Sequence, residues 1–524
     1  MDKLRSDMSI PAALYSVAEI RAIEADYQAR LAPGTLMRRA GEAASNLALE
    51  LLAGVKGPVL VLAGPGNNGG DALECAAELA DAGVAVDVVL LAPDAPAPSP
   101  EAAQALARAR AGAVRFVDDI DDHRRYRLAV DGLFGIGLAR ALAGRARALV
   151  ERLDTLACPV LALDVPSGLD ADTGSIVGPD GVAVRATHTL TYLGDKPGLH
   201  TADGCDHAGR VHVALLGVDL AQAAPPQAVI NAPTLFAHHL RPRRQNSHKG
   251  SYGDVAVLGG AHGMAGALLL AARAALFAGA GKVFGAAIDP GLGVDPTHPE
   301  IMLRDAAGFV FENRSVAAGP GMGDSAGATR MLAKALDTAK ALVLDADALN
   351  LIAASPELQA RVAARPEPAL LTPHPLEAAR LLGVTAAVIQ ADRLENAREL
   401  AMRLNAVVVL KGAGSVIARP DGQVAINPTG NPGLATGGTG DVLAGLCAAL
   451  LAQAWPAWEA ALGAVWLHGA AADRLVDDGV GPIGLTAGEL PAAIRSAFNA
   501  LVRDRSHTLD PVVPSEAGTQ GLGA

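Results

Sequence analysis

Short apolar runs alternate with longer amphipathic segments along most of the chain, and this alternation predicts the strands and helices of an α/β fold. In the first half, residues 58–63 predict a buried strand, residues 64–70 a glycine-rich loop and residues 71–82 an amphipathic helix. The next strand is expected at residues 84–91, which completes a strand, helix, strand unit. Further strands are predicted at residues 128–130 and 160–164. We therefore expect a Rossmann-like parallel sheet in the first half.

A second series of strands follows a change of composition between residues 217 and 250. That stretch is rich in proline and basic residues, which is typical of a connection between domains: Pro225, Pro226, Pro233 and Pro242, with Arg241, Arg243, Arg244, His248 and Lys249. Apolar runs then predict strands at residues 254–258, 341–345, 369–372 and 407–410. The prediction is an N-terminal domain of residues 1–225, a C-terminal α/β domain of residues 235–505, and a loose tail of residues 506–524.

The composition limits the class of protein. Of the 524 residues, 51% are hydrophobic but only 3% are aromatic, so the cores must be built from Ala, Val and Leu. A net charge of -12 argues against a general nucleic-acid or membrane surface, although backbone amides can still hold an anionic nucleotide. The four cysteines are far apart, without CxxC pairs or an accompanying histidine cluster, which favours neither a disulfide framework nor a zinc site. The start of the chain has no apolar signal segment, and a cytoplasmic protein is expected.

A glycine loop near the end of the chain predicts a phosphate site. Residues 437–441 read Gly-Gly-Thr-Gly-Asp and lead directly into the apolar stretch 442–451, so the loop opens a helix. Glycines and a helix N-terminus hold anions through backbone N–H groups. Because a carboxylate beside phosphate is repulsive, Asp441 is interpreted as a base for a hydroxyl that attacks phosphorus. The alternative is a helix capped by Thr439 or Asp441.

Three glycine-and-acid loops of the first half follow strands whose carboxyl ends are expected at one sheet edge. They lie at residues 64–71, 130–137 and 163–170. Asn68, Asp131 and Ser167 offer only oxygen ligands, which suit a monovalent or alkaline-earth cation. Asp164 is left as an ionisable group facing the ligand, able to act as acid and base. Each residue alone could instead cap a helix or close a turn.

These loops resemble those of the NAD(P)H-hydrate epimerase family, through residues 67–71, the Asp131 loop and residues 164–168. The resemblance implies K⁺ binding by Asn68, Asp131 and Ser167. It also implies substrate contacts by Asn67, Asn68, Gly69, Gly70, Asp71, Gly135, Ile136, Gly137, Leu138, Ala139, Arg140, Ala141 and Asp164. This chain has Ala72 where the family usually has glycine, and little harm is expected from so small a residue.

The second half resembles the ADP- or ATP-dependent NAD(P)H-hydrate dehydratases, a branch of the ribokinase-like fold. The motifs that carry this resemblance follow the family's order: residues 248–253, 259–260, 263–267, 319–323, 344–350, 372–375, 411–415 and 437–441. The resemblance implies that Ala267, Gly323, His374 and Asp441 face the hydrated nicotinamide nucleotide. It implies that the adenine nucleotide, ADP with Mg²⁺, is held by Lys411, Gly412, Ala413, Gly414, Ser415 and Gly440. Leu376 replaces an expected glycine and could reshape the rim of the site. No Walker-type phosphate loop is present.

Two residues of this second set also have simpler interpretations. Lys411 follows a predicted strand and precedes glycine, so it could be an exposed lysine in a turn. His374 lies between two prolines and could be a histidine packed in a turn rather than a substrate contact.

Together the two resemblances imply repair of NADH or NADPH that has added water at C6 of the nicotinamide ring. The first domain would interconvert the R and S hydrates through Asp164, and the second would phosphorylate the 6-hydroxyl through Asp441 and eliminate it. ADP is the donor that the two-domain fusion implies, with ATP left open. The alternatives are a ribokinase-like small-molecule kinase and a first domain that is a non-catalytic binding scaffold. A homo-oligomer acting on small molecules is expected, with no nucleic acid or membrane partner.

Overall fold

The N-terminal half forms a seven-stranded sheet, in the order β4-β3-β2-β5-β6-β7-β8, in which all neighbouring strands are parallel. The computed structural model describes residues 12–93, 99–222, 225–291 and 293–509. The strands are β2 (Val59–Ala63), β3 (Val86–Leu90), β4 (Arg115–Val117), β5 (Leu128–Gly132), β6 (Val160–Leu163), β7 (His188–Tyr192) and β8 (Arg210–Ala214). The helices are α2 (Val17–Gln28), α3 (Thr35–Leu52), α4 (Asn67–Asp81), α5 (Pro100–Ala111), α6 (Gly144–Leu153) and α7 (Gly204–His207).

The strands predicted from the apolar runs of this half are confirmed as β2, β3, β5 and β6. The predicted helix begins earlier than residue 71, because the asparagines and glycines of the loop already form the first turn of α4 after the N-cap Gly66. Strands β4, β7 and β8 are additional elements. Both faces of the sheet are covered, with α3 and α4 packed on one face and α6 on the other.

The C-terminal half contains a mixed sheet of eleven strands in the order β1-β9-β18-β17-β16-β15-β14-β13-β10-β11-β12. Its strands are β1 (Ala13–Leu14), β9 (Ala228–Ile230), β10 (Asp254–Gly259), β11 (Lys282–Ala287), β12 (Met302–Asp305), β13 (Ser315–Ala318), β14 (Ala341–Leu344), β15 (Leu370–Leu371), β16 (Val407–Leu410), β17 (Val416–Ala418) and β18 (Val424–Ile426). Its helices are α8 (Ala265–Phe277), α9 (Ala326–Thr338), α10 (Ala346–Ala353), α11 (Pro356–Ala363), α12 (Pro375–Leu382), α13 (Ala386–Ala391), α14 (Arg393–Leu404), α15 (Thr439–Ala452), α16 (Ala457–Asp477) and α17 (Leu490–Leu509).

The predicted strands of this half are confirmed as β10, β14, β15 and β16, and the apolar stretch after Asp441 is helix α15. One face of the sheet packs against α8, α15, α16 and α17, and the other packs against α9 to α14. Because α15 is buried along most of its length, its N-terminus is fixed against the sheet. Among the described residues, no helix combines the length and apolar character needed to cross a membrane.

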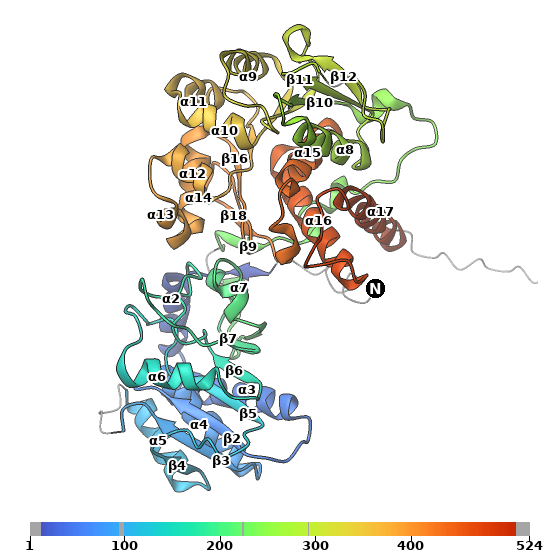
Figure 1. Ribbon diagram of the computed structural model, residues 1–524. Helices are drawn as coiled ribbons and strands as arrows, with labels where there is room; N and C mark the ends of the chain where they lie inside the picture. Colours follow the sequence, from blue (N-terminus) through green and yellow to red (C-terminus); the bar gives the residue numbers. More distant parts are fainter. Residues whose placement is uncertain (1–11, 94–98, 223–224, 292, 510–524) are drawn as a thin grey trace, which may run out of the picture.

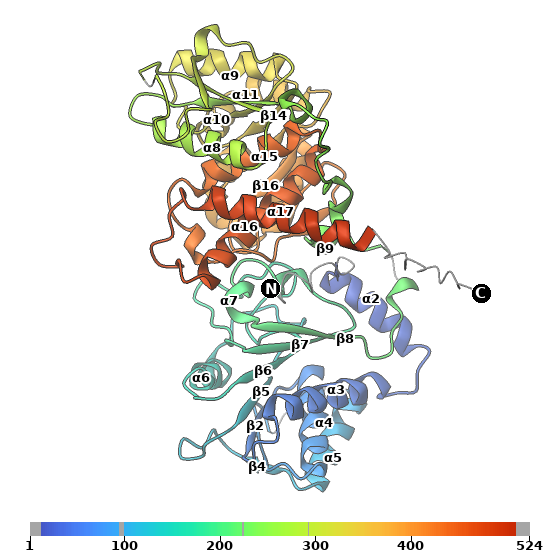
Figure 2. The ribbon, with the colours of Figure 1, turned by 90° about the vertical axis from the view of Figure 1, so that its right-hand side faces the viewer.

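The two halves meet along the strands at one end of the large sheet (Figure 1; Figure 2). Strand β1, from the beginning of the described chain, pairs antiparallel with β9, and β9 pairs with β18. Leu14 also bridges to Asp195 of the N-terminal half. The sheet of the C-terminal half thus includes a strand from residues 13–14, inside the range predicted for the first domain, while the boundaries themselves stay a prediction. Helix α17 includes residues 506–509 of the predicted tail, and residues 510–524 lie outside the described part of the chain.

Candidate functional site

A cavity of about 730 Å³ opens at the carboxyl ends of β2, β5 and β6. Ligands bind at such edges of open parallel sheets because the loops that leave the strands surround a common space. The predicted site residues that line the cavity are Asn67, Asn68, Asp71, Gly135, Ile136, Gly137, Leu138 and Asp164. The structure therefore brings together residues from three separate loops.

The other residues of the predicted substrate set lie outside this lining. Gly69 and Gly70 are buried in the first turn of α4, and a Cβ on Gly69 would approach the Gly64 carbonyl oxygen to 1.9 Å. Glycine at that position allows α4 to start close against the strand exit. Ala139, Arg140 and Ala141 are exposed on the segment beyond Leu138.

Asp164 is held in a left-handed backbone conformation directly after β6, with a φ of 64°. Such a conformation is uncommon for a residue other than glycine and is maintained by its surroundings. Its Oδ2 accepts a hydrogen bond of 3.0 Å from the Ile136 N–H, and its Oδ1 accepts one of 2.9 Å from Lys196 Nζ. The carboxylate therefore has a fixed position at the cavity wall.

Lys196 is a site residue that the sequence analysis did not identify. Its side chain is fully buried, and Nζ also donates to Thr191 Oγ1 at 2.6 Å and to the Tyr192 carbonyl oxygen at 2.9 Å. One feature of the sequence could have pointed to Lys196. It lies in the segment that follows residues 188–192, and these residues form another parallel strand that ends at the same edge of the sheet. A buried lysine is expected to have a carboxylate partner, and here the partner is Asp164.

Two more carboxylates belong to the same cavity. Burial raises the pKa of Asp71 well above its usual value, and the charges of Asp164 and Glu24 add to the shift. Burial likewise raises the pKa of Glu24, with the charge of Asp164 as the next contribution. Carboxyl groups with raised pKa values beside a ligand cavity are suited to proton transfer near neutral pH.

The predicted cation ligands lie at the strand ends beside the cavity, which Asn68 also lines. The Asp131 carboxylate is fully buried and accepts hydrogen bonds from the Ser167 N–H at 2.8 Å and from Ser167 Oγ at 2.7 Å. Asn68 donates through Nδ2 to the Leu163 carbonyl oxygen, whereas its buried Oδ1 has no hydrogen-bond partner among the described residues. An unpartnered amide oxygen near a buried carboxylate supplies the hard donors that a monovalent cation prefers. These residues fit K⁺.

Ala72 stands where the epimerase family usually has glycine, and its side chain fits without a clash. Its side chain is fully buried in α4 and faces Gly132 at the end of β5, where an added Cβ would lie 2.4 Å from the Ala72 Cβ. The methyl group thus occupies space that the glycine of the neighbouring strand leaves free.

The second candidate site lies at the N-terminus of α15. Gly438 is the N-cap residue, with a φ of 93° that favours glycine. No hydrogen-bond acceptor is recorded, within the described residues, for the backbone N–H groups of Gly437, Gly438, Gly440 and Asp441. Unpaired N–H groups at the positive end of a helix dipole form an anion site. Neither Thr439 nor Asp441 is the N-cap residue, and Thr439 Oγ1 donates to the carbonyl oxygens of Leu434 and Thr436 instead of accepting from the helix N–H groups.

Asp441 lies in the first turn of α15 beside a lysine and other carboxylates. Burial raises the pKa of Asp441 to about 6, the charge of Asp345 adds to the shift and that of Lys411 opposes it. Lys411 Nζ donates to Asp345 Oδ1 at 2.7 Å, and Thr372 Oγ1 donates to the same oxygen at 2.8 Å. Lys411 is therefore a half-buried partner of Asp345 and not the exposed lysine of the simpler interpretation.

His374 forms the N-cap of α12, where its Nδ1 accepts hydrogen bonds from the N–H groups of Leu376 and Glu377. Burial lowers the pKa of His374, and the charge of Lys411 lowers it further. The ring is thus neutral near pH 7 and lies close to Lys411. The buried Glu377 carboxylate is 3.9 Å from Lys411 Nζ and completes the charged group. Leu376, the second departure from the family, is 47% exposed beside His374.

Gly323 and Ala267 belong to two segments that contact each other near Asp441. The Gly323 N–H donates to Asp347 Oδ2 at 2.8 Å, and the charge of Asp347 contributes to the raised pKa of Asp441. An added Cβ on Gly321 would lie 3.2 Å from the Ala267 Cβ at the start of α8. The loop that contains Gly323 therefore packs against the segment that contains Ala267.

Carboxylates in this second site fit Mg²⁺ bound to a nucleotide. Mg²⁺ usually takes one or two protein carboxylates and keeps water and phosphate oxygens as its other ligands. Asp345, Asp347 and Glu377 surround the position of Lys411 and Asp441 without forming a compact three-ligand cage among the described residues. Such an open set of oxygen donors matches that preference.

The loop predicted to hold the adenine nucleotide contacts the N-terminal half. The Ala202 N–H donates to the Ala413 carbonyl oxygen at 3.2 Å, and Thr201 Oγ1 donates to the Gly414 carbonyl oxygen at 2.9 Å. Arg393, which is 1% exposed, donates through Nε to Thr201 Oγ1 at 3.2 Å. Its guanidinium also lies where a Cβ on Gly412 would be placed. The loop is therefore supported from both halves of the chain.

Comparisons with known proteins match each half of the chain to a family. The family described as "NAD(P)H-hydrate dehydratase" matches residues 255–494, and the family described as "YjeF-related protein N-terminus" matches residues 33–198. The chain is 37% identical over 483 residues to the bifunctional NAD(P)H-hydrate repair enzyme Nnr of Escherichia coli, covering 90% of this chain and 91% of the relative. It is 39% identical over 448 residues to the Nnr enzyme of Moorella thermoacetica, covering 79% of this chain and 83% of the relative.

Among solved structures, the ADP/ATP-dependent NAD(P)H-hydrate dehydratase of Bacillus subtilis, co-crystallised with ATP and Mg²⁺, is 33% identical to this chain. The match covers 52% of this chain and 98% of that structure, with a TM-score of 0.46.

Proposed function

The chain belongs to the family of bifunctional NAD(P)H-hydrate repair enzymes, and on that premise we propose which of its residues perform each half of the repair. It is an α/β enzyme with a Rossmann-like N-terminal domain and a ribokinase-like C-terminal domain. It acts as an NAD(P)H-hydrate epimerase and as an ADP- or ATP-dependent NAD(P)H-hydrate dehydratase. The finer assignments below rest on the geometry of the two sites.

In the first site, Asp164 moves the proton that accompanies inversion at C6 of the hydrated nicotinamide ring. Its carboxylate is the acid group fixed at the cavity wall between the Ile136 N–H and Lys196 Nζ. Because Lys196 is fully buried and contacts Asp164 rather than the cavity, it acts as a positioning residue for that carboxylate. Asn67, Asp71 and the segment 135–138 surround the substrate.

Asn68, Asp131 and Ser167 would hold K⁺ at the strand ends beside this cavity. Their oxygen atoms fix the loops after β2, β5 and β6 relative to one another, and a bound cation would offset the buried charge of Asp131. The chemistry that K⁺ supplies is charge compensation and not redox or acid–base activity.

In the second site, Asp441 takes the proton of the 6-hydroxyl as that oxygen attacks the terminal phosphate of the nucleotide. The single observation that carries this assignment is the set of unpaired N–H groups at the start of α15, next to a carboxylate whose pKa is raised to about 6. The N–H groups stabilise charge that develops on the phosphate. Mg²⁺ bound to the nucleotide supplies further charge stabilisation there.

The nucleotide, for which we propose ADP as the donor, lies along residues 411–415 and Gly440. An added Cβ on Gly440 would be 3.4 Å from Lys411 Nζ, so the helix start and the loop after β16 approach each other closely. Transfer of the terminal phosphoryl group from ADP releases AMP and converts the 6-hydroxyl into a phosphate ester, which is a good leaving group. Elimination of phosphate from C6, with loss of a proton from the adjacent ring carbon, restores the reduced nicotinamide. Ala267, Gly323 and His374 then border the hydrated ring on the side of α8 and α12.

The test is incubation of the purified protein with a mixture of R and S NADH hydrate and with ADP, ATP or no nucleotide. The expected result is recovery of the ultraviolet absorbance of NADH and release of phosphate, most rapidly with ADP. Recovery of only the S fraction would show that the first site is inactive. Accumulation of a stable phosphorylated product without recovery of absorbance would instead indicate a ribokinase-like small-molecule kinase.

A further inference from the structure

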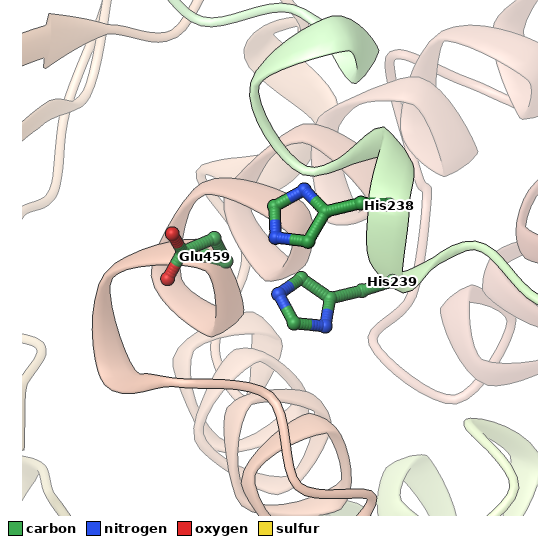
Figure 3. A group of neighbouring side chains, drawn as sticks. All are labelled: His238, His239 and Glu459. Atoms are coloured by element: carbon green, nitrogen blue, oxygen red, sulfur yellow. The ribbon is translucent and has the colours of Figure 1, made fainter.

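Two consecutive histidines meet a glutamate at a surface that the repair reaction does not use. His238 and His239 end the short turn η4 (Ala237–His239), and Glu459 lies in the first turn of α16. One potential ligand atom of each residue lies within 4.8 Å of the other two, and no other such group of three is found among the described residues. Figure 3 shows a ring nitrogen of each histidine on the side that faces Glu459.

His239 has a ring nitrogen that the protein leaves without a partner. Its Nε2 is buried and makes no hydrogen bond within the described part of the chain. Buried polar atoms without partners are rare, because desolvation is then uncompensated. The ring is held in place by stacking on Trp455, with ring centroids 5.0 Å apart and an interplanar angle of 27°. The nitrogen is therefore directed toward Glu459 and His238 by packing and not by a hydrogen bond (Figure 3).

The donor types of these residues suit a metal ligand set. Neutral imidazole and ionised carboxylate are the forms that coordinate a metal. The positive charge of the nearby Arg241 repels a bound cation and so lowers the affinity of the site for a metal, but Arg241 takes away none of the three donor atoms.

We propose that His238, His239 and Glu459 form a binding site for a zinc-type divalent transition metal. Two imidazole nitrogens and one carboxylate oxygen are donors typical of Zn²⁺, whereas Mg²⁺ and Ca²⁺ prefer oxygen ligands throughout. Donor atoms around a tetrahedral Zn²⁺ lie about 3.4 Å apart, so the side chains must close by roughly an ångström. His238 is exposed and Glu459 is only partly buried, which leaves both side chains room to rotate. Water completes the coordination.

Such a metal would join the segment that enters the C-terminal domain to helix α16. The same helix carries Asp473, whose carboxylate accepts hydrogen bonds from the Gly430 N–H and from Asn431 Nδ2, each at 2.9 Å. Those residues begin the loop that leads to the N-terminus of α15. The site is thus a structural metal site that stabilises the frame of the second active site and takes no part in its chemistry.

The experiment uses the full chain without an affinity tag, stripped of metal and titrated with Zn²⁺ by calorimetry in the presence of excess Mg²⁺. We expect one Zn²⁺ per chain and a higher melting temperature when it is bound. Co²⁺ should give visible d–d absorption of a site with nitrogen and oxygen donors. His238→Ala and Glu459→Gln should each weaken Zn²⁺ binding by at least about tenfold, which is about 1.4 kcal/mol.

Matched controls separate this site from incidental binding. His123→Ala removes an exposed histidine of the N-terminal domain and should leave Zn²⁺ binding unchanged. His239→Ala can also weaken packing on Trp455, so Glu459→Gln decides the outcome if that variant is unstable. Thiolate charge-transfer bands with Co²⁺, equal binding by wild type and both variants, or no binding at all would each overturn the proposal. If no metal binds, the role of Glu459 is to stabilise the N-terminus of α16 through its favourable interaction with the helix dipole.

Discussion

Lys196 Nζ lies 2.9 Å from Asp164 Oδ1 and is completely shielded from solvent, whereas Asp164 faces the cavity of the first site. The two residues come from the ends of neighbouring parallel strands, β6 and β7. Through this ion pair the buried Lys196 fixes the position of Asp164, the proposed acid–base group. Epimerisation should therefore depend on the pair.

Lys196→Met should reduce R-to-S epimerisation by at least about a hundredfold, because Asp164 loses its positioning partner. The measurement is epimer conversion followed by chromatography in the absence of nucleotide. A fall in kcat at nearly constant KM, together with unchanged dehydration of the S hydrate, would indicate a positioning role. Lys56→Met, at an exposed lysine, is the control. Equal loss of both activities would show general unfolding instead.

Asp441→Asn should abolish dehydration and leave epimerisation intact, because the carboxylate is needed only for the attack on phosphate. The converse variant, Asp164→Asn, should remove epimerisation only. Phosphate release and epimer conversion, measured on the same preparations, check both expectations. Loss of both activities in either variant would contradict the division between two sites.

The dehydration rate should depend on the ionisation of Asp441. Since the pKa of Asp441 is raised to about 6, the base is ionised above that pH, and kcat/KM should rise with pH through about 6 and then level off. Asp345 is one of the charges that raise this pKa. In Asp345→Asn the midpoint should therefore move to lower pH. A midpoint that does not move would argue that another group is titrating.

K⁺ should stabilise the N-terminal domain through Asn68, Asp131 and Ser167. We expect the melting temperature and the epimerisation rate of the wild type to be higher in K⁺ than in Li⁺ at equal ionic strength. Asn68→Ala removes the unpartnered Oδ1 and should abolish that difference, while dehydration is unaffected. An Asn68→Ala protein that still distinguishes the two ions would contradict the assignment.

Gly414→Ala should weaken the contact between the two halves of the chain. The residue has a φ of 57°, and an added Cβ would lie 1.9 Å from the His200 carbonyl oxygen. The strain is expected to destabilise the protein by about 1–3 kcal/mol. Thermal unfolding and nucleotide affinity measure the effect, and Gly488→Ala, where an added Cβ meets no atom within 4 Å, is the control. An unchanged nucleotide affinity would show that the contact with residues 200–202 does not support the loop.

Local patterns in the sequence were enough to predict much of the fold. The apolar runs gave β2, β10 and β16 within a residue or two, because a strand buried on both faces needs continuous hydrophobic side chains. The helix after Asp441 was predicted for the same reason, since glycine punctuation and an apolar run determine where it starts. The start of α4 was predicted too late, because glycine and asparagine also suit the first turn of a helix whose N–H groups are unpaired.

The order of the strands predicted which loops meet at the first cavity, but the sequence did not predict the residue that supports them. Loops that leave parallel strands converge at one edge, so Asn68, Asp131 and Asp164 could be placed together from their order alone. Lys196 could not, because the strand before it has alternating polar residues and a lysine in sequence is usually exposed. The roles of individual site residues stay predictions that the variants above can check.

The sequence by itself determined the two α/β domains, the glycine loops and the acidic residues, because strand burial, helix starts and backbone turns depend on neighbouring residues. Only the tertiary structure decided which distant side chains touch: Lys196 with Asp164, Lys411 with Asp345, Thr201 with Gly414, and the histidines at 238 and 239 with Glu459. These contacts join segments that are far apart along the chain. Such contacts depend on how sheets and helices pack in space, and this packing cannot be predicted from a local pattern of residues.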